Sequence, residues 1–130
     1  MSFIFGKKSL EKINNPKFHP KLKLLLIEAI KTSPIDFTVL ETVRTLATQK
    51  EYLKKGTTKT LKSRHIPLSN KSGLCEAVDV APYPIDWSDK KRFIQLSEHI
   101  KKTANKLNIP ITWGGDWKTL VDMPHYEIKI

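Results

Sequence analysis

The sequence predicts one domain of the α+β class with a small sheet, and three observations lead to this fold class. The chain has 130 residues, of which 39% are hydrophobic, so it can bury a single core without disulfide bonds. Segments with helical periodicity interleave with short segments rich in β-branched and aromatic residues. We find no internal repeat, low-complexity tract or linker that would divide the chain.

The first half of the chain contains four predicted elements. Residues 9–13 predict a short helix, which the following Asn-Asn-Pro sequence ends. A second helix begins at His19 with a proline in its first turn, and its apolar residues recur at spacings of three and four. Residues 37–43 are rich in β-branched and aromatic side chains and predict a strand. Residues 45–54 predict a helix that ends at Gly56.

The second half completes the alternation of helices and short strands. Residues 77–81 predict a strand bounded by a proline. Ser88 is the expected N-cap of a long helix that reaches Leu107 and carries one apolar face. Residues 111–113 predict a strand before a Gly-Gly turn, and residues 126–130 alternate as a terminal strand. This interleaving is typical of an α+β domain.

The chain is strongly basic, with 23 Lys and Arg against 13 Asp and Glu and a net charge of +10. A basic protein is attracted to polyanions such as nucleic acid, envelope polymers or lipid surfaces. The lysines are dispersed in pairs, which is more typical of solvated helix faces than of a surface that recognises nucleic acid. Zinc-finger spacing, an RNA-binding aromatic signature and a basic recognition helix are all missing from the sequence, so a nucleic-acid-binding domain is an alternative that rests on charge alone.

Composition also bears on the compartment. No run approaches the ~20 apolar residues that a membrane span needs, and the N-terminus lacks the apolar centre of a signal peptide. We therefore expect no export signal and no stable membrane insertion. The single cysteine, Cys75, cannot form an internal disulfide bond. It is either a small, half-buried hydrophobic residue or a metal ligand.

Two of the four histidines, together with one aspartate, are candidate metal ligands. His19 starts a helix and His99 lies on the long helix, so both are expected to be structural or solvated. His65 lies in a polar segment, and His125 directly precedes the last strand. Asp79 is the only carboxylate of an apolar strand, where it needs a partner. Two imidazoles and a carboxylate form a typical catalytic zinc set, although spacing alone allows other pairs of histidines with any of the 13 acids.

Three further residues have both a functional and a structural interpretation. Asp122 lies three residues before His125 and could accept a proton from an activated water, or it could cap the turn before Pro124. Arg44 follows the first predicted strand and could bind a carboxylate or an oxyanion, or extend into solvent. Trp113 precedes the Gly-Gly turn and could line a ligand site or pack in the core.

Several short motifs occur in a fixed order from about Phe37 to the C-terminus. They are ETVRT at 41–45 with Gln49, GTTKT at 56–60, SRH at 63–65, AVD at 77–79 followed by Pro82, WGGDW at 113–117 and DMPHYE at 122–127. In this order they resemble the zinc D-alanyl-D-alanine carboxypeptidase/endolysin family, and in particular phage L-alanyl-D-glutamate endopeptidases.

The resemblance implies a small antiparallel sheet that carries a zinc site and is flanked by helices, as in Hedgehog/DD-peptidase-like folds. It implies Zn²⁺ as the cofactor, with His65, Asp79 and His125 as ligands, and Asp122 as the catalytic acid/base. It also suggests residues that contact the substrate or the transition state. These are Arg44, Ser63, Gln49 and Trp113.

The implied activity is that of a phage-type endolysin, which hydrolyses the L-alanyl-D-glutamate bond in peptidoglycan stem peptides and lyses the host. We expect residues 1–130 to be a single, monomeric zinc peptidase domain that binds peptidoglycan without a separate wall-binding module. Without a signal peptide, it would accumulate in the host cytoplasm and reach the wall after a separate membrane-permeabilising factor acts. A D,D-carboxypeptidase that removes terminal D-alanine is the alternative enzyme.

One segment departs from the family pattern. His65 and Asp79 are fourteen residues apart, whereas this spacing is shorter in many members of the family. Residues 67–76 therefore look like an inserted loop, and insertions in loops are usually tolerated. We expect this loop to affect substrate specificity more than the metal site, and it could form one wall of the cleft.

Overall fold

A four-stranded antiparallel sheet forms the centre of the described chain, in the strand order β1-β2-β4-β3. The structure is a computed structural model that describes residues 3–56, 63–119 and 121–129. The strands are β1 (Phe37–Glu41), β2 (Ala77–Pro82), β3 (Ile111–Trp113) and β4 (His125–Ile128). The α+β class and the small antiparallel sheet predicted from the sequence are therefore confirmed.

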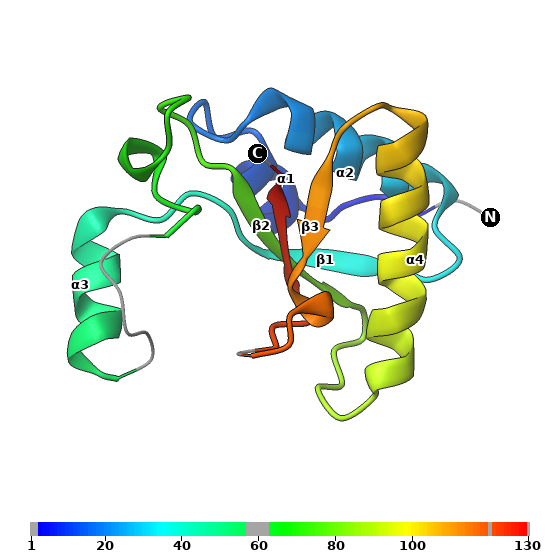
Figure 1. Cartoon of the computed structure of the whole chain (residues 1–130). Helices are drawn as coiled ribbons and strands as arrows, with labels where there is room; N and C mark the ends of the chain where they lie inside the picture. Colours follow the sequence, from blue (N-terminus) through cyan, green and yellow to red (C-terminus); the bar gives the residue numbers. More distant parts are fainter. Residues whose placement is uncertain (1–2, 57–62, 120, 130) are drawn as a thin grey trace.

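Helices α1 (Lys7–Ile13), α2 (Pro20–Thr32) and α4 (Lys90–Lys106) contribute buried side chains to one core against the sheet. Helix α3 (Leu46–Lys54) lies to the side of this layer (Figure 1) and buries only Gln49. Two 3₁₀ turns, η1 (Pro67–Ser69) and η2 (Gly114–Asp116), complete the described elements. Among the described helices, none has the length and apolar character that crossing a membrane requires.

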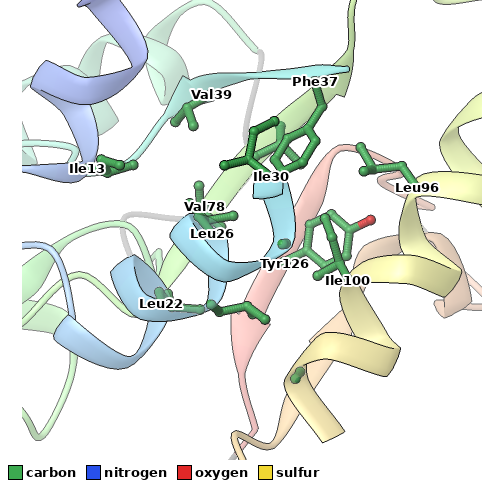
Figure 2. Close-up of a cluster of buried hydrophobic side chains, with 14 of the residues drawn as sticks. Ile13, Leu22, Leu26, Ile30, Phe37, Val39, Val78, Leu96, Ile100 and Tyr126 are labelled. Carbon is green, nitrogen blue, oxygen red and sulfur yellow. The ribbon is translucent and has the colours of Figure 1, made fainter. Parts of the chain in front are cut away.

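Strand alternation separates a core face of the sheet from a polar face. Val78 and Tyr126 lie in the core, where Figure 2 shows them near Leu26 of α2 and Ile100 of α4. Side chains of adjacent strand residues point to opposite faces. The residues next to this pair, Asp79 on β2 and His125 on β4, therefore point away from the helices. Both candidate ligands project from the face that the helices leave uncovered.

Several predicted boundaries shift by one or two residues. Strand β1 ends at Glu41, two residues before the predicted end, and its register with β2 shifts between Val39 and Glu41. The N-cap of α4 is Asp89, which accepts a hydrogen bond from the Arg92 backbone N–H, while Ser88 donates to the neighbouring Asp86. A helical turn, η2, replaces the expected tight turn at the Gly-Gly pair.

Candidate active site

The pairing of β2 with β4 brings two of the candidate ligands together. Asp79 lies directly opposite His125 in the antiparallel register. Opposite residues on one face of such a pair are close neighbours. His125 Nδ1 consequently lies 3.1 Å from Asp79 Oδ1.

The third candidate, His65, reaches the same point from the segment that precedes η1. Its backbone is held at both ends, because its N–H donates to Ser63 Oγ and its carbonyl accepts from the Arg44 N–H. His65 Nε2 lies 3.3 Å from Asp79 Oδ1, and the centroids of the two imidazole rings are 5.3 Å apart. One ligand atom from each of the three residues falls within 4.8 Å of the others. The predicted set thus converges on one position.

Two outer contacts orient the imidazole rings. His65 Nδ1 lies 2.7 Å from the carbonyl oxygen of Thr42, which can only accept, so this nitrogen carries the proton and Nε2 has its lone pair free. His125 Nε2 lies 2.8 Å from Glu127 Oε1, so in the neutral imidazole Nε2 keeps the proton and Nδ1 carries the lone pair. Partners of this kind commonly fix the tautomer of a metal-binding histidine. Neither partner was predicted from the sequence, although Glu127 follows His125 at the spacing that places it on the same strand face.

The electrostatics of the cluster match these contacts. Burial opposes ionisation of Asp79, but its contacts with the His125 and His65 imidazoles outweigh burial and lower the pKa of Asp79 below its usual range. Burial also disfavours the charged form of His125, yet its hydrogen bonds with Asp79 and Glu127 raise its pKa to about 9. The metal-free cluster therefore holds a positive charge between two carboxylates near neutral pH.

The donor set fits a zinc ion. Zinc prefers imidazole nitrogen and carboxylate oxygen at about 2.0–2.2 Å in a tetrahedron, whose edges are then roughly 3.3–3.5 Å long. The distances of 3.3 Å from His65 Nε2 and 3.1 Å from His125 Nδ1 to Asp79 Oδ1 are close to such edges. Three protein ligands leave a fourth position for water or substrate. Zinc could therefore be held by His65, Asp79 and His125.

A pocket of about 270 Å³ opens over the three ligands. Its wall is polar, and seven further residues line it. They are Arg44, Gln49, Ser63, Arg64, Trp117, Asp122 and Glu127.

Asp122 lies in this pocket wall as a half-buried carboxyl group. Burial and the nearby charge of Asp79 raise the pKa of Asp122, which makes its carboxylate a stronger proton acceptor than an ordinary aspartate. Its backbone is fixed by two hydrogen bonds, one to the Gly114 carbonyl and one from the His125 N–H. A Cβ atom added at Gly114 would lie 2.2 Å from the Asp122 carbonyl oxygen, so this close approach requires glycine.

Three predicted substrate-contacting residues form one hydrogen-bonded group. Arg44 binds both carboxylate oxygens of Glu41 through two nitrogens and donates to Gln49 Oε1 at 2.8 Å. It also lies 3.5 Å from Ser63 Oγ, and its guanidinium group stacks 4.8 Å from the ring centroid of Tyr52. This group presents one positive charge, partly balanced by Glu41, to the pocket.

Trp113 is not brought to this pocket, which corrects the expected placement. Its side chain is 5% exposed, its Nε1 donates to the Met123 carbonyl, and its ring stacks on Tyr126. Trp113 and Tyr126 are paired residues of β3 and β4, so both face the core. Trp117, beyond η2, lines the pocket instead, with its ring centroid 5.2 Å from that of His125.

The segment before β2 also differs from expectation. Residues 66–76 are all described, and none of them lines the pocket, so the inserted loop does not form a wall of this cleft. Cys75 is fully buried, and burial raises the pKa of its thiol to about 12. It is not among the converging ligands, so the hydrophobic interpretation holds. Most of the GTTKT motif, residues 57–60, lies outside the described residues.

Two imidazoles and a carboxylate around one point, with a separate carboxyl group in the adjoining pocket, are an arrangement that metal-dependent hydrolases use. Comparisons with known proteins identify the family. The model of the phage L-alanyl-D-glutamate peptidase family matches residues 1–129. The chain therefore belongs to that family, and it is a peptidase.

Individual relatives agree with this assignment. The chain is 34% identical to the L-alanyl-D-glutamate peptidase of Escherichia phage T5, over 99% of this chain and 91% of that protein. It is 26% identical to the L-alanyl-D-glutamate peptidase of Listeria phage A118, but spans only 43% of that relative. The crystal structure of Serratia marcescens L-Ala D-Glu endopeptidase ChiX is similar, with a TM-score of 0.81, 32% identity, and coverage of 97% of this chain and 90% of ChiX.

Proposed function

We propose that the chain is a zinc-dependent endolysin that hydrolyses the L-alanyl-D-glutamate bond of peptidoglycan stem peptides. The observation that carries this proposal is the convergence of His65, Asp79 and His125 beside Asp122 in an open pocket. The names of the relatives support the bond, because the phage T5 and A118 proteins are both L-alanyl-D-glutamate peptidases. We further propose that it acts as a single-domain monomer.

In this mechanism the ligands and the pocket residues have separate tasks. Zinc held by His65 Nε2, His125 Nδ1 and Asp79 would supply a Lewis acid that polarises a carbonyl group and acidifies water. Asp122 accepts the proton of the attacking water and returns it to the leaving amine of D-glutamate. Arg44 stabilises negative charge that develops on the scissile carbonyl oxygen, with Gln49 and Ser63 holding its side chain. Thr42 and Glu127 keep the two imidazoles in their binding tautomers.

The site of action follows from the substrate. Peptidoglycan lies outside the bacterial membrane, so we propose that the enzyme is made in the host cytoplasm and reaches the wall after a separate factor permeabilises the membrane. The chain's net charge of +10 is consistent with attraction to the anionic envelope.

Metal removal tests the proposed function directly. We expect purified cell walls to lose turbidity with the enzyme, to stay turbid after treatment with a chelator, and to clear again when zinc is restored. Analysis of the released ends should show new amino-terminal D-glutamate and new carboxy-terminal L-alanine. Free D-alanine without these ends would instead indicate a D,D-carboxypeptidase. Full clearing by metal-free protein would rule out the zinc mechanism.

Zinc binding is expected to release about one proton per chain at pH 7.5. The pKa of His125 is about 9 in the metal-free protein, so its imidazole is charged at this pH and must lose a proton to bind metal. Affinity should therefore rise by up to about tenfold per pH unit as pH increases toward 9. Calorimetry in two buffers with different ionisation enthalpies measures the proton directly. Binding heats that are equal in both buffers would contradict this prediction.

A further inference from the structure

Arg64 directly precedes the candidate ligand His65 in the sequence. Its guanidinium group contacts three oxygen acceptors from other parts of the chain. Its guanidinium group donates to Glu127 Oε2 at 3.0 Å and to Glu76 Oε1 at 2.7 Å. A third contact, at 2.7 Å, is to the carbonyl oxygen of Ile128. These contacts tie the end of β4 to the segment that leads into β2.

The contact with Glu127 bears on the metal site. One oxygen of this carboxylate binds Arg64, and the other accepts from His125 Nε2 at 2.8 Å. The Glu127 carboxylate is thus held at both oxygens and cannot rotate away from His125 without breaking a charge-assisted bond. Arg64 is the group that holds Glu127 in the orientation His125 needs.

The inserted loop holds Arg64 in turn. Asn70 Nδ2 donates to the carbonyl oxygens of Arg64, at 2.9 Å, and of Leu74, at 2.8 Å, which closes the loop on the Arg64 backbone. The backbone N–H of Glu76 donates to the same Arg64 carbonyl, while its side chain binds the guanidinium group. The Ile128 N–H donates to the Glu76 carbonyl, which attaches the end of the loop to β4.

We propose that Arg64 is a positioning residue of the metal site, and that residues 67–76 hold its backbone and side chain in place. The loop and Glu76 hold Arg64, Arg64 holds Glu127, and Glu127 holds the His125 ring with Nδ1 free to bind metal. The inference rests on the proposed function, since it assumes that the site binds zinc. It gives the loop a role in metal affinity instead of substrate contact.

The test compares zinc dissociation constants, measured by competition with a chromophoric chelator, for the wild type, Arg64→Gln, Arg64→Lys and Glu127→Ala. We expect Arg64→Gln and Glu127→Ala to weaken zinc binding by about 10–100-fold, as loss of outer partners of a metal-binding histidine commonly does. Arg64→Lys can keep one contact with Glu127, so its zinc dissociation constant should lie between those of the wild type and Arg64→Gln. Arg92→Gln is the matched control, because the Arg92 guanidinium group also donates to the chain, at the backbone carbonyl oxygens of Tyr83 and Pro84, but away from the pocket.

A spectroscopic signal separates positioning from general stability. In the zinc-loaded wild type, the His125 Nε2–H proton should give a slowly exchanging NMR signal because Glu127 accepts it. We expect this signal to broaden or move in Arg64→Gln and to remain in Arg92→Gln. Wild-type zinc affinity and an unchanged signal in Arg64→Gln would overturn the inference. An effect of Arg64→Gln on KM alone would also overturn it, because that result indicates substrate binding. Failure of the wild type to bind zinc would refute the proposed function itself.

Discussion

Replacing Asp122 by asparagine is expected to lower the rate of wall hydrolysis by about 10²–10⁴-fold, the usual contribution of general acid–base catalysis. Zinc content should stay at the wild-type level, since Asp122 is not among the three converging ligands. The amide is similar in size to the carboxyl group but cannot accept the proton of the attacking water. Initial rates of release of new amino termini, together with metal analysis of the purified variant, check both parts.

Asp116→Asn provides a matched control for this variant. Asp116 belongs to the neighbouring turn η2, pairs with Lys101 and is largely exposed, so its loss should leave the rate near wild type. The pH profile adds a second check. Because burial and Asp79 raise the pKa of Asp122, the wild-type rate should fall as pH drops, beginning at a higher pH than an ordinary aspartate would give. Full turnover by Asp122→Asn would show that another group moves the proton.

Replacing any one of His65, Asp79 or His125 by alanine is expected to remove zinc and activity together. In the proposed site each residue supplies one of the three ligands found among the described residues, so the loss of affinity should exceed the roughly 10–100-fold effect of losing an outer partner. Metal content after equilibration with micromolar zinc and the rate of wall clearing should both fall to background. Restoring millimolar zinc should recover little activity, because the ligand geometry is lost.

If the three residues bind one metal ion, the effects of replacing them should not add up. A double variant, His65→Ala with His125→Ala, should be no less active than either single variant, because both have already lost the metal. His99→Ala is the control, since His99 Nε2 contacts the Ala29 carbonyl between α2 and α4 instead of the pocket. Zinc bound with wild-type affinity by His125→Ala would remove that residue from the ligand set.

The inner part of the candidate site could be predicted because its chemistry is visible in the sequence. Asp79 is a carboxylate in an apolar strand, where it needs a partner, and the motif around His125 resembles a known family. The outer contacts could not be predicted in the same way. Thr42 acts through its backbone carbonyl, which every residue has, and Glu127 is one of 13 acidic residues until the register of β4 is known.

The fold was predictable at the level of elements but not of side-chain direction. Trp113 and Trp117 flank the same Gly-Gly pair, and no local pattern tells which one faces the pocket. The answer depends on the pairing of Trp113 with Tyr126 in the sheet, which turns Trp113 into the core. The inserted loop is a similar case, because its direction is set by Asn70 and by long-range contacts of Arg64 with β4.

The Asp79–His125 pairing across β2 and β4 has a consequence for the folding of the chain. A slip of β4 by one residue would turn His125 toward the helices and Tyr126 toward the pocket, so metal ligation and the correct register require each other. The ligand pairs are 14 and 46 residues apart in sequence, so a bound ion acts as a cross-link between distant segments. At free zinc about 1,000 times the dissociation constant, this cross-link would add about 4 kcal/mol to the free energy of unfolding. The thermal midpoint of the enzyme would then depend on the zinc concentration of its surroundings.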